Sequence, residues 1–415
     1  MKINNPIIDL FAGCGGLSLG LEKAGFNPVY VNELNNDALQ TYMHNRDDSD
    51  FLRNSDFHSH DIAELTKKED NLLKLQKNLI NKFNIKKGGL SLIVGGPPCQ
   101  GYSGIGHRRN YTVEKSEIPS NYLYKEMIKV INFFRPKAFI FENVRGLLSA
   151  RWTKKGKKGE IFYDVRKQFS KLKDYFQDFA LVQSKNYGVP QNRPRILLLG
   201  IRSDIKFKRN GKGIASGLLP AGDNSYPHPE ELLSDLLDKN YNEEYITLKY
   251  PSEPKTKIQR ILRTKKNGNS YFKKGEHLTE QEYSKHSDLI TNKFRYMIKN
   301  GGSIPKKFKT KKFAQRVLPK KWNGLGPNIT ATSLPDDYVH YSQPRSLTVR
   351  EWARLQTFPD WYEFKGKRTT GGLRRAGNPQ KNIFEREIPK YTQIGNAVPV
   401  ELAKRIGLHL KKIFS

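Results

Sequence analysis

The feature that most constrains the fold is an alternation of short apolar runs and amphipathic stretches through the first 200 residues. Five runs are typical of strands: "PIIDLFAG", "PVYVNEL", "SLIVGG", "AFIFENV" and "RILLLGI". Residues 72–83 and 122–134 instead repeat apolar side chains at helical spacing. Strands separated by helices are typical of βαβ units. The sequence therefore predicts an α/β fold with a doubly wound, mostly parallel sheet.

This pattern ends near residue 200, and a different composition follows. Residues 204–344 are rich in Lys, Asn, Gly and Pro and contain only short apolar clusters. Helical spacing returns at residues 345–364, and the chain closes with a loop and an amphipathic helix that we expect to dock on the first domain. A chain of 415 residues is long enough for two domains. We predict one domain from 1–203 plus 388–415 and a smaller, irregular domain at 204–387.

The chain carries a net charge of +32, from 73 Lys and Arg against 41 Asp and Glu. Residues 255–321 hold 20 basic and four acidic residues, so this window alone carries +16, half of the net positive charge of the chain. Concentrated positive charge favours a polyanionic partner such as nucleic acid, because it contacts phosphates and releases counterions. The alternative is a lysine-rich coding bias, in which many of these lysines are merely solvated. Their concentration in one window favours a binding face.

Cysteine content and hydropathy exclude several classes of protein. Cys14 and Cys99 are the only cysteines, and they make neither a disulfide framework nor a zinc site, so we expect no metal. The N-terminal apolar run is too short for a signal peptide, and no stretch approaches 18 apolar residues. We therefore expect a cytoplasmic protein with no membrane partner.

A glycine cluster follows the first predicted strand. Gly13 and Gly15 let the backbone approach a ligand and present helix-terminal N–H groups. The G-x-G-x-x-G dinucleotide fingerprint is not matched, and a glycine cluster alone is often a tight turn. Glu33 ends the second predicted strand 20 residues after Gly13, where a carboxylate can accept hydrogen bonds from ribose hydroxyls. Asp61 precedes Ile62, which pairs a further carboxylate with an apolar wall for a ring.

Cys99 stands in "GGPPCQGYS", directly after a predicted buried strand. Gly-Gly-Pro-Pro continues neither a strand nor a helix, so the cysteine lies just past a strand end. In open α/β folds that edge binds ligands, whereas a structural cysteine more often lies within an apolar run. Spacing alone leaves both interpretations open.

Six segments follow one another along the chain: "DLFAGCGG", "GGPPCQGYS", "FENVRGLL", "QNRPR", "RSLTVREWARLQTFP" and "IGNAVPV". Together they resemble the ordered motifs of the DNA cytosine-5 methyltransferases. The resemblance covers residues 7–203 and 345–410. It implies a Rossmann-like domain that binds S-adenosylmethionine and a smaller target-recognition domain. It also implies a cytosine flipped out of double-stranded DNA into the cleft between them.

The resemblance also implies the catalytic residues. Cys99 is the nucleophile whose thiolate adds to carbon 6 of cytosine, so that carbon 5 attacks a sulfonium methyl group. Glu142 holds the base at N3 and its amino group, although "ENV" alone would indicate only a turn involving Asn143. Arg193 and Arg195 alternate along an extended segment, which predicts that both point into the cleft. The family places Arg195 at the base carbonyl and Arg193 near the cysteine or a phosphate.

Cofactor residues are assigned in the same way. The resemblance places Phe11 against adenine or the sulfonium and Glu33 at the ribose. Asp61 and Ile62 match adenine contacts. Further members of this predicted pocket are Gly13, Gly15, Pro98, Leu123 and Asn396. Cys14 matches a family position used for its backbone, so we assign it no catalytic role.

The basic insertion at 204–344 matches the variable recognition region of the family. We expect it to read a DNA target of about four to six base pairs through phosphates and base edges. After the nucleophile, Arg108 and Arg109 lie in a glycine-rich segment that suits a mobile, phosphate-clamping loop. No further reader module accompanies these motifs. That is typical of a monomeric bacterial modification enzyme, for which a cognate restriction endonuclease would act separately.

Three alternative functions compete with this assignment. One branch of the family carries the same motifs and methylates cytosine in tRNA, but the large basic insertion favours duplex DNA. A catalytically silent DNA-binding homologue would lack Cys99, Glu142 or the arginines, and all of them are present. A NAD-dependent oxidoreductase is disfavoured because the dinucleotide fingerprint is absent.

Overall fold

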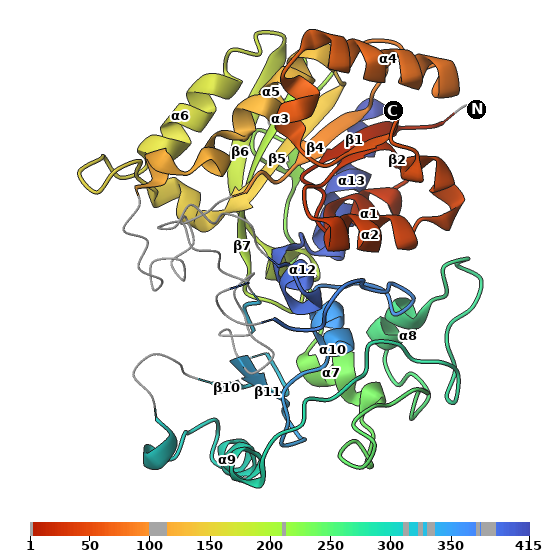
Figure 1. The fold of residues 1–415 in the computed structure, drawn as a ribbon, viewed down its shortest axis with the longest axis vertical. Helices are drawn as coiled ribbons and strands as arrows, with labels where there is room; N and C mark the ends of the chain where they lie inside the picture. Colours follow the sequence, from red (N-terminus) through yellow and green to blue (C-terminus); the bar gives the residue numbers. More distant parts are fainter. Residues whose placement is uncertain are drawn as a thin grey trace.

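The computed structural model describes residues 3–98, 114–209, 213–309, 315–322, 327–329, 337–370, 374 and 387–415. Cys99 and the segment with Arg108 and Arg109 lie outside these ranges. Figure 1 shows two regions stacked along the long axis. We call them the sheet region (residues 3–222 and 388–415) and the second region (residues 223–387).

The sheet region is built on a seven-stranded sheet of order β3-β2-β1-β4-β5-β7-β6. Neighbouring strands pair in parallel from β3 to β5, whereas β7 runs antiparallel to β5 and to β6. The predicted α/β fold with a mostly parallel sheet is therefore confirmed. The strands are β1 (Pro6–Leu10), β2 (Asn27–Asn32), β3 (His58–Ser59), β4 (Leu92–Gly95), β5 (Ala138–Val144), β6 (Tyr175–Gln183) and β7 (Pro194–Arg202).

Helices cover both faces of this sheet, because successive strand residues point to opposite sides. Ile8 and Phe139 pack in the cluster on one face, and Ile7 and Ile140 pack in the cluster on the other. The first face carries α2 (Asn36–His44), α3 (Ile62–Thr66), α4 (Glu69–Phe83), α5 (Tyr124–Phe134) and α6 (Glu160–Phe169). The second face carries α1 (Gly16–Glu22) and α13 (Val400–Phe414).

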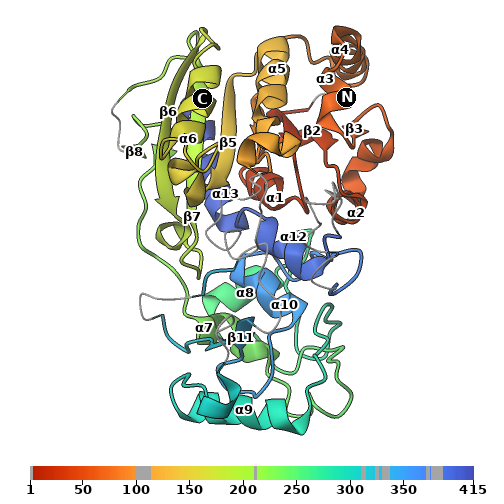
Figure 2. The ribbon, with the colours of Figure 1, turned by 60° about the vertical axis from the view of Figure 1, so that its left-hand side comes forward.

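The C-terminal helix docks on the sheet region, as predicted. Gly20 in α1 permits this contact, because a Cβ there would lie 2.4 Å from the Cβ of Ala403 in α13. The segment before α13 was predicted to be a loop, but it contains α12 (Lys390–Asn396). Figure 2 shows α12 between the sheet and α10 (Val349–Leu355).

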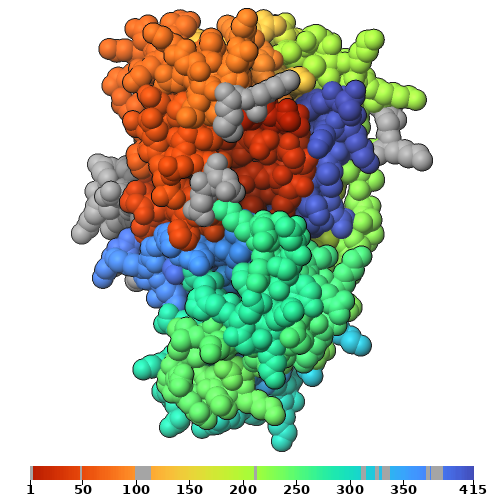
Figure 3. Space-filling view, turned by 90° about the vertical axis from the view of Figure 1, so that its right-hand side faces the viewer, coloured from red at the N-terminus to blue at the C-terminus, as the bar shows by residue number. Residues whose placement is uncertain are grey.

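The second region has little regular structure among its described residues, and Figure 3 shows it, in green and cyan, packed against the sheet region. Its helices, besides α10, are α7 (Pro229–Leu233), α8 (Lys257–Arg263) and α9 (Asp288–Lys299), and its two-residue strands are β10 (Arg316–Val317) and β11 (Tyr338–Val339). A hairpin of β8 (Gly213–Ile214) and β9 (Leu219–Pro220) precedes it and packs against α13.

The helical segment predicted at 345–364 is shorter in the structure. Only α10 is helical there, from Val349 to Leu355. The helix ends because Thr357 adopts a left-handed φ of 61° and Pro359 has no backbone N–H to donate. Apolar residues at helical spacing continue past this point, but the backbone there forms turns and irregular segments, from which these side chains pack into the apolar core.

The order of the strands defines where a ligand would bind. From β1 the chain continues outward to β2 and β3, and from β4 it continues to β5 on the other side. In such sheets ligands bind outside the carboxyl ends of the strands, at the point where the order reverses. The glycine turn follows β1 and the Gly96-Pro97-Pro98 segment follows β4, so both predicted motifs lie at this switch point.

Candidate active site

Glu142 lies near the carboxyl end of β5, and its side chain is almost fully buried. Arg195 on β7 faces it, with Nε 2.6 Å from the Oε1 atom of the carboxyl group. Burial raises the pKa of Glu142, while the positive charges of Arg195 and Arg193 lower it in part. The site therefore contains a carboxyl group that holds its proton more strongly than a glutamic acid in water.

Gly96 places this carboxyl group beside the segment that leads to Cys99. A Cβ atom at Gly96 would lie 2.8 Å from Oε2 of Glu142, so only glycine fits without displacing the carboxyl group. Asn143 donates a hydrogen bond from Nδ2 to the carbonyl oxygen of Pro97 at 3.2 Å. These two contacts join the end of β5 to the prolines before Cys99, which itself lies outside the described residues.

Arg193 makes a different set of contacts from Arg195. Its guanidinium group donates to the carbonyl oxygen of Ile329, to that of Gly395 at 2.6 Å and to that of Ala397 at 3.1 Å. These acceptors belong to the second region, to the last turn of α12 and to the residue that follows α12. Arg193 therefore joins β7 to the second region and to the end of α12, whereas Arg195 is paired with Glu142. The predicted role of Arg193 near the cysteine stays a prediction.

Two buried glutamines that sequence reasoning did not single out extend this junction. Gln191 donates from Nε2 to the carbonyl oxygen of Leu355 at 2.6 Å and to Oε1 of Gln356 at 2.9 Å. Gln356 in turn donates to the carbonyl oxygen of Ile394 at 2.7 Å. Both glutamines lie inside quoted motifs, "QNRPR" and "RLQTFP". A buried amide needs hydrogen-bond partners, which explains why these motifs meet in space.

The glycine turn after β1 is held by Glu33. The backbone N–H of Gly13 donates to Oε2 of Glu33 at 2.7 Å, and that of Asn35 donates to Oε1 at 2.8 Å. Burial raises the pKa of Glu33, and these two hydrogen bonds lower it in part. Gly13 has a φ of 56°, and no atom lies within 4 Å of the position its Cβ would occupy. The structure thus brings Gly13 and Glu33 together beside open space.

The other predicted cofactor residues lie along the same edge of the sheet, in differing environments. Phe11 follows β1 with a left-handed φ of 55° and is half-buried. Asp61 caps α3 by accepting from the N–H of Ala63 at 2.8 Å, and its side chain is exposed. Ile62 is instead buried in the apolar core beneath it. Gly15, the N-cap of α1, has a φ of 83°, Pro98 and Leu123 are half-buried, and Asn396 is exposed at the end of α12.

Cys14 lies within the turn, fully buried, and its thiol donates to the carbonyl oxygen of Gln393 at 3.4 Å. Burial raises the pKa of this thiol to about 12, which opposes formation of a nucleophilic thiolate. Its backbone carbonyl accepts a hydrogen bond from the hydroxyl of Tyr362 at 2.5 Å. Tyr362 comes from the second region, so that region directly supports the glycine turn.

A buried polar cluster lies beneath the turn. Arg46 donates to Oε1 of Glu22 at 2.6 Å and to the hydroxyl of Ser18 at 3.2 Å. Asp9 on β1 is buried beside them, and burial raises its pKa to about 7. Side chains from β1, α1 and the end of α2 are thereby joined under the cofactor edge.

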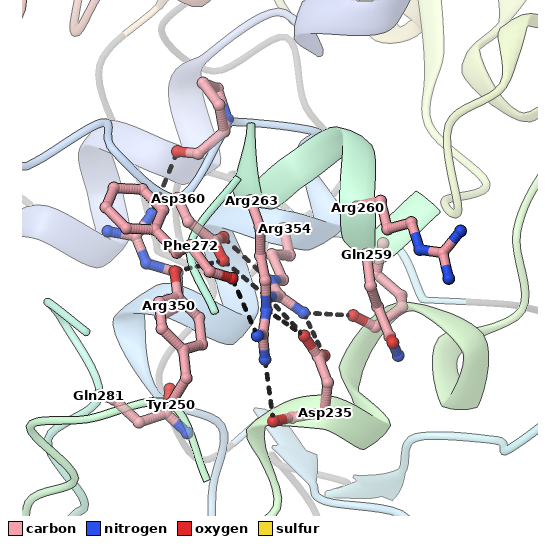
Figure 4. Close-up of polar contacts among 12 residues, drawn as sticks. Asp235, Tyr250, Gln259, Arg260, Arg263, Phe272, Gln281, Arg350, Arg354 and Asp360 are labelled. Carbon is pink, nitrogen blue, oxygen red and sulfur yellow. Dashed lines mark hydrogen bonds and ion pairs between the residues drawn. The ribbon is translucent and has the colours of Figure 1, made fainter. Parts of the chain in front are cut away.

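Buried ion pairs hold the second region together, as Figure 4 shows. Arg354 lies 2.6 Å from Asp235 and 2.6 Å from Asp360, and Arg263 lies 2.7 Å from Asp235. The hydroxyl of Tyr250 donates to Asp360 at 2.8 Å. These side chains join α8, α10 and the short 3-10 helix η7 (Ser234–Leu236), none of which is long enough to be stable alone.

No group of three or more His, Cys, Asp or Glu residues in the described part of the chain could hold a metal ion. Among the described helices, none is long and apolar enough to cross a membrane.

Comparison with known proteins decides the family. The sequence-family model of the C-5 cytosine-specific DNA methylases matches residues 6–412. The chain belongs to this family. Type II methyltransferase M.DdeI of Desulfomicrobium norvegicum is 29% identical over 98% of this chain and 89% of its own length. Type II methyltransferase M.AgeI of Thalassovita gelatinovora is 26% identical over 98% and 99% of the two chains.

The family assignment makes the chain a DNA cytosine-5 methyltransferase, of the kind found in type II restriction-modification systems. Its fold is also found in a solved structure of an E. coli prophage protein described as a DNA modification methyltransferase. The two have a TM-score of 0.67 and 22% identity, and the match covers 99% of each chain. This likeness concerns the fold, and it agrees with the α/β sheet described above.

Proposed function

We propose that this methyltransferase transfers a methyl group from S-adenosylmethionine to carbon 5 of cytosine within a specific short sequence of double-stranded DNA. Cys99 would be the covalent nucleophile, and Glu142, Arg193 and Arg195 would complete the catalytic site. The observation that carries this proposal is the position of Glu142. Its buried carboxyl group lies against Gly96, three residues before Cys99, and is paired with Arg195.

The residues at the switch point fit S-adenosylmethionine. Gly13 faces open space, and each carboxyl oxygen of Glu33 has a lone pair left after its backbone hydrogen bond, so ribose hydroxyls can donate to it. Asp61 is exposed and keeps acceptor capacity for an amine. Phe11, Pro98, Leu123, Ile62, Gly15 and Asn396 complete the proposed pocket. When bound, the cofactor supplies an electrophilic methyl group.

The chemistry of the protein side chains follows from the base. Carbon 5 of cytosine is a poor nucleophile, so the Cys99 thiolate first adds to carbon 6 and breaks the conjugation of the ring. A proton shared between Glu142 and N3 withdraws electrons from the ring as the S–C6 bond forms, and the raised pKa of Glu142 suits this role. After methylation, loss of the proton on carbon 5 expels the thiolate and restores the ring.

We assign DNA reading to the domain predicted at 204–387, of which residues 223–387 form the second region, and catalysis to the domain predicted at 1–203 and 388–415. Duplex DNA must open at the target, because carbon 6 is inaccessible within the base stack. The enzyme would act as a monomer on bacterial DNA in the cytoplasm, with any cognate endonuclease working separately.

Methyl transfer by the purified protein tests this proposal. The protein is incubated with S-adenosylmethionine carrying a tritiated methyl group and with either unmethylated plasmid DNA or tRNA. We expect label in DNA, loss of labelling in Cys99→Ser, and retention of cofactor binding by that variant. Labelling of tRNA alone would replace DNA with RNA as the substrate, and full activity of Cys99→Ser would remove the nucleophile assignment.

A further inference from the structure

We propose that the basic loop, residues 151–158 between β5 and α6, binds phosphates of the DNA backbone beside the target cytosine. This inference rests on the proposed function, since it requires duplex DNA at the carboxyl edge of the sheet. The loop reads "RWTKKGKK" and contains no carboxylate. Its five cations, Arg151, Lys154, Lys155, Lys157 and Lys158, are all exposed.

The cations of the basic loop are free of ion pairs with the described residues. Other lysines on the surface do find partners: Lys129 lies 2.7 Å from Glu126, and Lys265 lies 2.6 Å from Glu276. The carboxylates nearest in sequence, Glu160 and Asp164, accept hydrogen bonds from the backbone of the loop and from the indole of Trp152. The basic loop therefore presents uncompensated positive charge.

Trp152 anchors the start of the basic loop. Its ring stacks on that of Tyr122, with centroids 4.7 Å apart and planes 7° apart. Its indole N–H donates to Oδ2 of Asp164 in α6 at 2.6 Å. An aromatic anchor that is stacked and hydrogen-bonded on two elements fixes the start of the loop against the body of the sheet region.

Glu160, the first residue of α6, fixes the rest of the loop. Its carboxylate accepts from the backbone N–H of Trp152 at 2.5 Å and from that of Lys157 at 2.9 Å. Gly156 makes room for it, since a Cβ there would overlap the carboxylate at 1.9 Å. The backbone is thus ordered before any ligand binds, which reduces the entropy lost when the lysine side chains bind phosphate.

The loop lies on the edge of the sheet that carries the proposed site. Glu142 is near the carboxyl end of β5, the 3-10 helix η5 (Arg145–Ser149) follows, and the basic loop comes next. Figure 1 shows the loop protruding beside the first turn of α6. Its backbone also contacts the segment that follows the Cys99 motif: the N–H of Ser116 donates to the Trp152 carbonyl at 3.2 Å, and the N–H of Lys154 donates to Glu114 at 3.4 Å.

These observations together point to a phosphodiester backbone. A base that reaches Glu142 must come from a DNA strand that crosses this edge of the sheet. The phosphates next to that base carry negative charge, which would compensate the five cations of the loop. Lysines bind phosphates as point charges without reading sequence. The basic loop would therefore contribute affinity and salt dependence, while base recognition lies elsewhere.

The test is the salt dependence of DNA affinity in a variant with Lys154, Lys155, Lys157 and Lys158 changed to Gln. Affinity for a fluorescent duplex that carries the sequence methylated by the wild type is measured by anisotropy over a range of NaCl concentrations. Each phosphate contact contributes about 0.9 to the slope of log affinity against log salt. We expect the slope to fall by about two or more and affinity to weaken about tenfold or more near physiological salt.

Two matched variants distinguish an effect of the charge of the basic loop from an effect of lost charge anywhere on the protein. Changing Lys86, Lys167, Lys171 and Lys173 to Gln removes the same charge from exposed positions toward the opposite edge of the sheet, where β4 and β6 begin. Changing the four loop lysines to Arg keeps the charge. We expect both variants to retain the wild-type slope.

A loop variant whose slope equals that of the wild type, or whose loss equals that of the opposite-edge variant, would overturn the proposal. Methyl transfer to plasmid DNA by the wild type is measured separately. Its absence would count against the proposed function, whereas its presence with an unchanged slope would count against the basic loop alone.

Discussion

The two regions of this methyltransferase are stabilised by different means. The sheet region is organised by long strand pairings, such as β6 with β7 from Gln183 to Tyr175, and by two apolar clusters on the faces of the sheet. The second region has two-residue strands and short helices. It places Asp235, Arg354 and Asp360 at its centre, all essentially without solvent exposure.

This difference determines how each region responds to change. Apolar packing is distributed over many contacts, so a single substitution removes only part of it. A buried ion pair is concentrated in a few atoms, and removal of one partner leaves an uncompensated charge in the interior. The second region should therefore be sensitive at a few positions, and the sheet region more evenly tolerant.

The largest expected effect is that of Asp235→Asn. This change removes the shared partner of Arg354 and Arg263 and should lower the free energy of unfolding by about 3–5 kcal/mol. We expect DNA affinity to fall while S-adenosylmethionine still binds. Denaturant unfolding and calorimetric titration with the cofactor measure the two effects. Glu244→Gln, at an exposed position with no ion pair among the described residues, is the control. Equal stability of the two variants would contradict the comparison.

The buried acid of the sheet region predicts a pH effect of comparable size. Burial raises the pKa of Asp9 from 3.8 to about 7. Because the folded-state pKa lies above the unfolded one, this stabilisation is complete below about pH 4 and is lost as pH rises through about 7. The loss is on the order of 4 kcal/mol.

Asp9→Asn should remove this contribution. Unfolding by urea, measured from pH 4 to pH 8, should show the wild type losing stability relative to the variant as pH rises. A constant difference between the two proteins across this range would show that Asp9 is ionised throughout.

A smaller effect, on the rate, is expected for Glu142→Gln. The amide keeps the shape of the side chain but cannot share a proton with N3, so we expect kcat to fall about a hundredfold, or about 2.7 kcal/mol in barrier. DNA affinity should change only a few-fold. Single-turnover methyl transfer and equilibrium binding measure the two quantities. Equal losses in both would show that Glu142 only positions the base.

The smallest expected effect is a loss of cofactor affinity in Tyr362→Phe, at the contact between the two regions. Tyr362→Phe removes the hydrogen bond to the buried carbonyl of Cys14, at a cost of about 1 kcal/mol. We expect a weaker Kd for S-adenosylmethionine, by about fivefold, with DNA affinity maintained. The chain offers Tyr296→Phe as a control, since that tyrosine is partly exposed on α9. An unchanged cofactor Kd would mean that the second region does not support the turn.

The sheet was predictable because its buried strands are short apolar runs between amphipathic helices. Strands β1, β2, β4, β5 and β7 were all predicted in this way. Strand β6 was missed, because it is an edge strand whose residues are mostly half-buried, and polar Gln177 and Asp178 break its sequence, "YFQDFALVQ", before the apolar residues 179–182. The helix predicted over 345–364 failed after α10 because regular apolar spacing does not show a left-handed residue such as Thr357.

The candidate site was predictable only in part. Motif order led to Glu142 and Arg195, and the structure pairs them. Period-two alternation also led to Arg193, but it cannot show that the guanidinium group of Arg193 donates to carbonyl oxygens of two distant segments, at Ile329 and at residues 395–397. The buried arginines of the second region were hidden for the same reason. Periodicity reports which residues share a face, whereas the partner of a buried charge is set by tertiary structure.

Bisulfite sequencing of DNA from cells that express this chain tests the central claim most directly. We expect wild-type protein to protect cytosines within one short sequence, and Cys99→Ser, expressed to the same level, to protect none. Protection of the same cytosines by Cys99→Ser, or none by a folded wild-type protein that binds the cofactor, would contradict it.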